Sequence, residues 1–262
     1  MDAICRLDDR PPISALILAP TRELAMQIDQ QVEGLAYFTG ITSIAVYGGG
    51  DGIGYEQQRR ALREGVDIVI ATPGRLIAHM SSGTVRLGEI KFLVLDEADR
   101  MLDMGFKDDI NRIVRQVAGE RQTMLFSATM PPKIRAFAKT LLKHPKQVNI
   151  AISKPAEGII QQQYRLADEQ KTPLLKQILS SGHFKSVIVF SSTKDKVKAL
   201  GRELQKMNLA VQPFHSDLSQ EEREKILLRF KNKQLPILIG TDVLSRGIDV
   251  EGIDLVVNYD VP

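Results

Sequence analysis

The sequence of 262 residues contains no tryptophan, one cysteine, five tyrosines and nine phenylalanines. The single cysteine, Cys5, excludes an internal disulfide framework and fits a reducing compartment. So few aromatic residues argue against a protein that binds nucleic acid by stacking bases on its side chains. Residues 1–12 lack the apolar run of a signal peptide, and no segment has the apolar length of a membrane span. We therefore expect a soluble, cytoplasmic protein.

Several catalytic motifs are absent as well. The chain has no C-x-x-C, H-E-x-x-H or G-x-S-x-G, so zinc and serine-hydrolase chemistry lack support. No lysine follows a glycine, which excludes the phosphate-binding loop G-x-x-x-x-G-K-[ST] from these residues. The glycine-rich segment 47–54 does not match G-x-G-x-x-G either, and we interpret it as a flexible turn that lets the backbone approach a ligand. The net charge of +3 permits a basic groove without indicating one.

Short apolar runs alternate with helical patterns along the whole chain, which is typical of parallel α/β sheets. The pattern predicts helices such as 23–38 and 132–143. It lapses at 151–160, a segment that contains proline and glycine and that we interpret as a linker. We therefore predict two α/β domains in tandem, 1–150 and 161–262. The predicted strands are 15–19, 44–47, 67–71, 92–96, 123–127, 186–191, 210–215, 236–242 and 254–259.

Polar residues follow directly on most of the predicted strands. Ligands bind outside the carboxyl ends of the strands in open parallel sheets, so these residues are candidates for a binding site. Each of them also has a simpler explanation, because Thr21, Asp96, Ser127 and Thr241 are suitable N-caps for the helices that follow. Capping explains a single position well, but it explains so many positions together less well.

The stretch FLVLDEADRML, residues 92–102, places two carboxylates after an apolar strand. Asp96 is suited to hold Mg²⁺ beside a nucleotide, and Glu97 is suited to orient or deprotonate a water molecule. The hydroxyls of Ser127 and Thr129 can bond to such carboxylates.

Two further turns, PTRE (20–23) and TPGR (72–75), combine an arginine with hydroxyl and backbone donors at a strand end. These are the groups that bind the phosphate oxygens of nucleic-acid backbones. Either turn taken alone is equally explained as a proline turn with a solvated arginine. Among the histidines, only His215 follows a predicted strand in a position to contribute to a site.

The chain contains, in this order, APTRELA (19–25), GG (48–49), TPGR (72–75), DEAD (96–99), SAT (127–129), VIVFSST (187–193), Gln220 with Arg223, and GTDVLSRGIDV (240–250). In their order, these motifs resemble the DEAD-box family of ATP-dependent RNA helicases in superfamily 2. Asp99, where related DEAH proteins have histidine, favours the RNA-directed branch.

The resemblance implies two RecA-like domains that close on ATP and Mg²⁺ and bend one RNA strand, held by its backbone and shape. It implies that Asp96 holds the metal, that Glu97 acts on the attacking water, and that Ser127 and Thr129 couple hydrolysis to RNA handling. It also implies that Gly247 and Asp249 approach the nucleotide. The implied RNA contacts are Thr21, Arg22, Gly49, Thr72, Gly74, Arg75, Arg223 and Thr241.

The family pattern also includes a nucleotide-reading Q motif and a P-loop, which would precede residue 1, and an arginine-rich motif VI, which would follow Pro262. We therefore expect a fragment with negligible ATPase activity. We expect its first sheet to lack an internal strand, leaving a gap or exposed strand edges, and its second sheet to lack the last strand. The alternatives are a degenerate core that binds RNA without hydrolysing ATP and a DNA-directed member of the superfamily.

Overall fold

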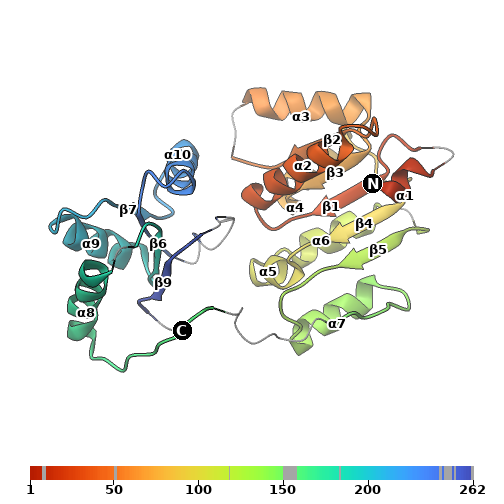
Figure 1. Cartoon of the computed structure of the whole chain (residues 1–262). Coiled ribbons are helices and arrows are strands. Elements are labelled where there is room, and N and C mark those ends of the chain that lie inside the picture. Colours follow the sequence, from red (N-terminus) through yellow and green to blue (C-terminus); the bar gives the residue numbers. More distant parts are fainter. Residues whose placement is uncertain are drawn as a thin grey trace. The chain divides into compact units, whose positions relative to one another are not determined.

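The computed structural model describes residues 1–7, 10–49, 52–117, 119–149, 158–182, 184–241, 244, 250 and 252–260. The chain divides into two compact units, Met1–Gln147 and Val148–Pro262 (Figure 1). Among the described residues, no helix has the length and apolar character needed to cross a membrane.

In the described part of the first unit, five parallel strands form a sheet in the order β2-β3-β1-β4-β5 (Figure 1). The strands are β1 (Ala15–Leu18), β2 (Ser43–Val46), β3 (Ile68–Ala71), β4 (Phe92–Leu95) and β5 (Gln122–Leu125). The helices are α1 (Asp2–Cys5), α2 (Arg22–Ala36), α3 (Gly52–Glu64), α4 (Pro73–Ser81), α5 (Ala98–Asp103), α6 (Lys107–Val114) and α7 (Pro132–Leu141).

Both faces of this sheet are covered, which explains why its strands read as continuous apolar runs. Successive side chains of β1 point to opposite faces. Ala15 and Ile17 pack in one core with Val32 of α2, while Leu16 and Leu18 belong to a second core to which α4, α5, α6 and α7 contribute. The first unit is therefore a doubly wound α/β domain.

In the described part of the second unit, four parallel strands are ordered β7-β8-β6-β9. The strands are β6 (Val187–Phe190), β7 (Val211–Phe214), β8 (Ile237–Gly240) and β9 (Leu255–Asn258), and the helices are α8 (Asp168–Ser181), α9 (Lys194–Gln205) and α10 (Gln220–Lys231). One core packs α8 and α9 on the sheet, and another packs α10 on the opposite face. Pro213 lies in β7, an edge strand, where the missing N–H is tolerated.

All nine predicted strands are present among the described residues, and the prediction of two parallel α/β sheets is confirmed. The predicted helices 23–38 and 132–143 are also confirmed as α2 and α7, each slightly shorter at its C-terminal end. Most of the predicted linker 151–160 lies outside the described residues.

Of the two outcomes expected for the first sheet, a gap or exposed strand edges, the described strands show the second. They pair without a gap, and β5 forms one edge with Gln122 exposed. One expectation changes. The glycine-rich segment 47–54 is not all turn, because α3 begins at Gly52. The strong helix formers in 56–64 extend the helix back into the glycines.

Candidate functional site

The order of the strands in the first sheet sorts the candidate residues into two groups. The loops after β2, β3 and β1 carry the glycine doublet and the two arginine turns, and these strands are neighbours. The loops after β4 and β5 carry the carboxylates and the hydroxyls, and these strands are neighbours too. Since all five strands are parallel, both groups lie along one edge, and they meet where β1 adjoins β4.

The two carboxylates after β4 are held differently. Asp96 donates its backbone N–H to Leu18 of β1 at 3.0 Å, and its Oδ1 accepts the N–H of Glu97 at 2.9 Å. Glu97 is the N-cap residue of α5 and has φ = 46°, a left-handed conformation that few non-glycine residues adopt. Backbone strain of this kind is concentrated at functional sites.

The environment of Glu97 suits a general base. Burial raises the pKa of Glu97 above its usual range, Arg100 opposes the shift, and Asp96 and Asp99 reinforce it. Arg100 Nη1 lies 3.8 Å from Glu97 Oε2, a weak pairing that leaves the carboxylate half exposed. A carboxylate with a raised pKa accepts a proton more readily than an ordinary one does at neutral pH.

The hydroxyls after β5 bond to Asp99, not to Asp96 or Glu97. Asp99 Oδ2 accepts from the N–H of Thr129 at 2.9 Å and from its Oγ1 at 2.7 Å. Ser127 Oγ accepts the N–H of Asp99 at 3.3 Å and donates to the carbonyl oxygen of Thr129 at 2.6 Å. Burial by itself would raise the pKa of Asp99, but the hydrogen bonds from Thr129, Arg100 and Ser127 hold it below its usual range.

Asp99 is therefore a functional candidate that the sequence prediction missed. It follows Asp96 by three residues and lies in the first turn of α5, where an acid would ordinarily be explained by the helix dipole. The spacing of three residues between Asp96 and Asp99 was the feature of the sequence that could have identified Asp99 as a candidate.

The fit of Mg²⁺ to this edge can be judged from the donors. Within the described residues no group of three or more His, Cys, Asp or Glu side chains is placed to hold a metal. Mg²⁺ bound with a nucleotide usually takes one or two carboxylates together with phosphate oxygens and water. Asp96 fits that pattern, because its hydrogen bond from Glu97 uses Oδ1 and the hard oxygen Oδ2 remains as a ligand.

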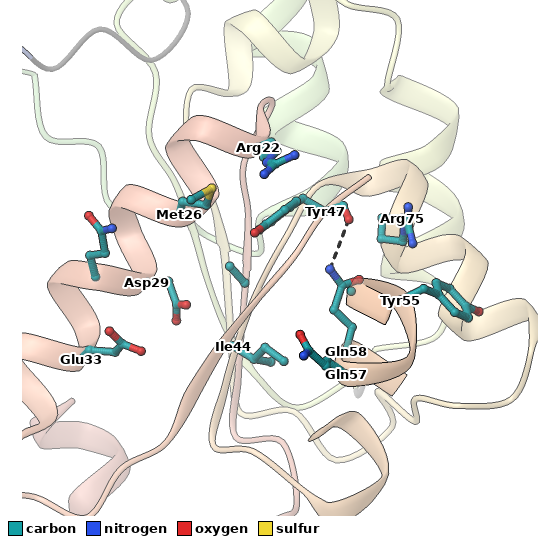
Figure 2. Close-up of a pocket in the computed structure, with 13 residues that line it drawn as sticks. Arg22, Met26, Asp29, Glu33, Ile44, Tyr47, Tyr55, Gln57, Gln58 and Arg75 are labelled. Carbon is teal, nitrogen blue, oxygen red and sulfur yellow. Dashed lines mark hydrogen bonds between the residues drawn. The ribbon is translucent and has the colours of Figure 1, made fainter. Parts of the chain in front are cut away.

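The arginine group is assembled around the glycine doublet. The guanidinium of Arg22 lies over the ring of Tyr47, 4.6 Å from its centroid (Figure 2). A Cβ added to Gly49 would lie 3.8 Å from Arg22 Nη1, and one added to Gly48 would lie 3.6 Å from Arg75 Nη2. Gly49 has φ = +89°, which requires glycine. Arg22 thus lies beside Gly49, and Arg75 lies beside Gly48 in the same turn.

The TPGR turn begins α4. Thr72 is its N-cap residue and Pro73 its first helical residue, and the N–H of Thr72 donates to Val46 at 2.9 Å. Gly74 is exposed in the first turn, and a Cβ added there would meet nothing within 4 Å. Packing does not require glycine at this position, so its bare backbone is available to a ligand.

Thr21 has a demonstrated structural role. It is the N-cap of α2, and its Oγ1 accepts the N–H of Leu24 at 3.2 Å. Its hydroxyl hydrogen can still be donated elsewhere. Asp96 is not a cap, since Glu97 occupies that position before α5, and Ser127 is not a cap either, since Pro131 precedes α7.

In the second unit, Arg223 and Thr241 follow the neighbouring strands β7 and β8. Arg223 lies in α10, and its Nη2 donates to the carbonyl oxygen of Ser216 at 2.9 Å. His215 is buried at the end of β7, and burial lowers its pKa. Gly247 and Asp249 lie outside the described residues.

Asp260 is a second residue that the sequence prediction missed. Its Oδ2 accepts from Ser191 Oγ at 3.0 Å and from Ser192 N–H and Oγ at 2.9 Å each, and Lys196 Nζ lies 3.0 Å from Oδ1. This carboxylate ties the segment after β9 to the loop after β6, two neighbouring strands.

Comparison with known proteins gives consistent matches. A family model described as DEAD/DEAH box helicase matches residues 1–137, and one described as helicase conserved C-terminal domain matches residues 170–262. ATP-dependent RNA helicase CshA of Listeria monocytogenes is 39% identical over 251 residues, which cover 95% of this chain and 48% of the relative. ATP-dependent RNA helicase DeaD of Buchnera aphidicola is 42% identical over 248 residues, covering 94% of this chain and 41% of the relative.

Among solved structures, that of S. cerevisiae Dbp5 bound to RNA and ADP BeF3 matches with a TM-score of 0.80 and 30% identity, covering 95% of this chain and 63% of that one. The chain spans about half the length of the curated relatives it matches. The fold is thus that of the RecA-like helicase domains. Because the first family model alone covers just over half of the 262 residues, the chain belongs to the DEAD/DEAH box helicase family.

Proposed function

We propose that the protein to which this chain belongs is a DEAD-box ATP-dependent RNA helicase, which couples ATP binding and hydrolysis to local unwinding of RNA duplexes or remodelling of RNA–protein complexes. We place it in the cytoplasm. The relatives named as ATP-dependent RNA helicases and the solved relative bound to RNA and ADP BeF3 support the proposal.

The observation that best supports the proposal is that carboxylates and arginines occupy separate, adjacent parts of one sheet edge. Carboxylates follow β4, arginines follow β1 and β3, and β1 is the direct neighbour of β4. A protein that only binds RNA has no need of a strained carboxylate with a raised pKa at that edge. The arrangement favours an enzyme over the alternative of a non-catalytic RNA-binding core.

The carboxylate group takes the catalytic roles. Asp96 would hold Mg²⁺, which would neutralise charge on the phosphates of ATP. Glu97 accepts a proton at its carboxylate from the attacking water, and its raised pKa suits that role. Ser127 and Thr129 form hydrogen bonds with Asp99. Through these bonds, a movement of the loop after β5 is coupled to the position of the catalytic carboxylates. We also propose nucleotide contacts for Gly247 and Asp249, which lie outside the described residues.

The arginine group holds RNA by its backbone. The guanidinium groups of Arg22 and Arg75 pair with phosphates, and the bare backbone of Gly49 and Gly74 permits close approach. The first turn of α4 offers N–H groups and a positive dipole end to a phosphate. The remaining RNA contacts are Thr21, Thr72, Arg223 and Thr241.

RNA binding by the 262-residue chain tests this assignment. We expect weak affinity for a labelled oligouridylate that falls as salt is raised. Arg75→Ala should lower the affinity, and it should reduce the slope of log affinity against log salt by about 1, since one phosphate contact is lost. Arg115→Ala, which removes an exposed arginine after α6, is the matched control and should change neither value. Equal effects of the two substitutions would contradict the assignment.

Two further measurements separate the competing functions. Competition between RNA and DNA of identical sequence distinguishes an RNA helicase from a DNA-directed relative. A polypeptide of residues 1–262 contains no P-loop lysine motif and should show negligible RNA-stimulated phosphate release. Phosphate release by that polypeptide would show that these residues suffice for hydrolysis.

A further inference from the structure

Beside Arg22 and Arg75 lies a small, partly buried cluster formed by Tyr55 and Gln58 of α3 and by His79 of α4. Gln58 and His79 are buried, with exposed fractions of 8% and 0%. The cluster adjoins a cavity of about 480 Å³ between α2, β2 and α3, which Tyr47, Tyr55, Gln58 and Arg75 help to line (Figure 2). No residue of the cluster belongs to the motifs by which the family is recognised.

Hydrogen bonds connect the cluster to the turn that carries the glycine doublet. Gln58 Nε2 donates to the carbonyl oxygen of Tyr47 at 3.3 Å, the bond drawn in Figure 2. Gln58 Oε1 lies 3.2 Å from His79 Nε2. Because the amide nitrogen of Gln58 is directed at a carbonyl, its oxygen accepts, and His79 must carry its hydrogen on Nε2. The chain of bonds thus runs from α4 through α3 to the residue before Gly48.

Ring contacts connect the same cluster to the arginines. The rings of His79 and Tyr55 are stacked, with centroids 4.5 Å apart and planes inclined by 9°. Arg75 lies over the ring of Tyr55, 5.2 Å from its centroid, and one helical turn before His79. Arg22 lies over the ring of Tyr47, whose carbonyl Gln58 holds. Each arginine therefore rests on a tyrosine that the cluster fixes.

We propose that Gln58 and His79 are positioning residues for RNA binding: they hold the platforms, Tyr47 and Tyr55, on which Arg22 and Arg75 are oriented toward the RNA backbone. The inference rests on the proposed RNA-binding role of Arg75. An arginine side chain has large rotational freedom, and ordering it when RNA binds costs free energy. A guanidinium already held over an aromatic ring loses less freedom on binding, so a rigid platform raises affinity without touching RNA.

Gln58→Leu tests the inference in the 262-residue chain, since leucine has a similar size but makes neither hydrogen bond. The control is Gln205→Leu in the second unit, where Gln205 Nε2 donates to the carbonyl oxygen of Val211 at 3.3 Å, a bond of the same type and length. We expect Gln58→Leu to weaken binding of a labelled oligouridylate about 3- to 10-fold and Gln205→Leu to change it less than about twofold.

A double-mutant cycle with Arg75→Ala asks whether Gln58 acts through the arginine. If it does, Gln58→Leu weakens binding by a smaller factor once Arg75 is absent. The same factor in both backgrounds, or equal effects of Gln58→Leu and Gln205→Leu, would overturn the inference while leaving the proposed function intact. An unchanged affinity in Arg75→Ala alone would overturn both.

His79→Phe provides a second variant in case Gln58→Leu does not fold. Phenylalanine keeps a ring to stack on Tyr55 but cannot donate to Gln58. We expect a fall in affinity in the same direction, with the thermal unfolding midpoint recorded for each variant. A well-folded His79→Phe that binds oligouridylate as tightly as the unaltered chain, at every salt concentration, would contradict the role assigned to the histidine.

Discussion

Asp99 and Thr129 are joined by two hydrogen bonds between the segments that follow neighbouring strands. Both bonds end on Asp99 Oδ2, one from the backbone N–H of Thr129 at 2.9 Å and one from its Oγ1 at 2.7 Å. Asp99 lies three residues after Asp96 in the segment that follows β4. Any movement of the loop after β5 therefore acts directly on α5, the helix that follows Asp96 and Glu97.

The first prediction concerns this link. Asp99→Ala removes charge-assisted bonds from Thr129 and should lower the free energy of unfolding by about 1–2 kcal/mol, discounted for partial exposure. Asp103→Ala, at the exposed end of the same helix, is the control and should cost less than about 0.5 kcal/mol. Denaturant unfolding followed by circular dichroism measures both. Equal costs would show that the link contributes nothing to stability.

The second prediction separates binding from stability at two glycines. Gly74→Ala places a methyl group in open space within α4, so stability should stay constant or rise by up to ~1 kcal/mol. Its affinity for oligouridylate should nevertheless fall, since the methyl group would occupy the proposed path of the RNA backbone.

Gly49→Ala is the contrasting variant. Its φ of +89° strains any L-residue, so this substitution should lower stability by about 1 kcal/mol or more as well as weakening RNA binding. Thermal unfolding and anisotropy titrations report the two quantities. A Gly74→Ala protein with unaltered RNA affinity would remove Gly74 from the proposed interface.

The third prediction is a pH dependence in the second unit. Burial would raise the pKa of Asp260, but hydrogen bonds from Ser192, Lys196 and Ser191 outweigh it and hold this pKa well below its usual range. The unfolded carboxyl, with a pKa of about 3.9, binds a proton before the folded one does. The stability contributed by Asp260 is therefore present above about pH 4 and is lost as the pH falls through the folded-state pKa.

Asp260→Asn measures that contribution. At pH 7 it should lower the free energy of unfolding by about 1–3 kcal/mol, and the difference from the unaltered chain should shrink as the pH is lowered below about 4. Asp217→Asn is the comparison, because Asp217 also has a low pKa, about 2, but bridges Lys194 and Lys198 at an exposed site. Its effect should be smaller and more sensitive to salt. A difference for Asp260→Asn that stays constant with pH would contradict the assignment.

The fourth prediction concerns His79. Burial lowers the pKa of His79, Arg75 lowers it further, and Glu56 opposes the shift. The unfolded histidine, with a pKa of about 6.5, therefore binds a proton at a pH where the folded one is neutral. Stability should fall as the pH is lowered from about 7 toward 5. His79→Phe should lack this part of the loss, whereas His215, which both proteins retain, contributes equally to each. Parallel stability curves for the two proteins would contradict a neutral, buried His79.

The strands and the family could be predicted from the sequence because their signals are local. Runs such as VIVF before Ser191 identify buried strands, and the order of short motifs along the chain identifies the family. The position of Thr21 before a helix could be predicted for the same reason, since an N-cap is defined by its immediate neighbours.

The order of the strands in the sheet could not be predicted, and it decides which loops become neighbours. Asp99 joins Thr129 only because β4 lies beside β5, and Asp260 joins Ser191 only because β9 lies beside β6. The cluster of Gln58 and His79 was missed for a related reason. An isolated glutamine in an amphipathic helix and a histidine on another look like ordinary surface residues until packing brings them together.

The most direct test of the central claim is RNA-stimulated phosphate release by the complete gene product carrying Glu97→Gln. The substitution keeps the size of the side chain and removes its ability to accept a proton. If Glu97 is the general base, phosphate release should fall by about 10²- to 10⁴-fold while affinity for oligouridylate stays within about twofold. Phosphate release at the unaltered rate would contradict the account.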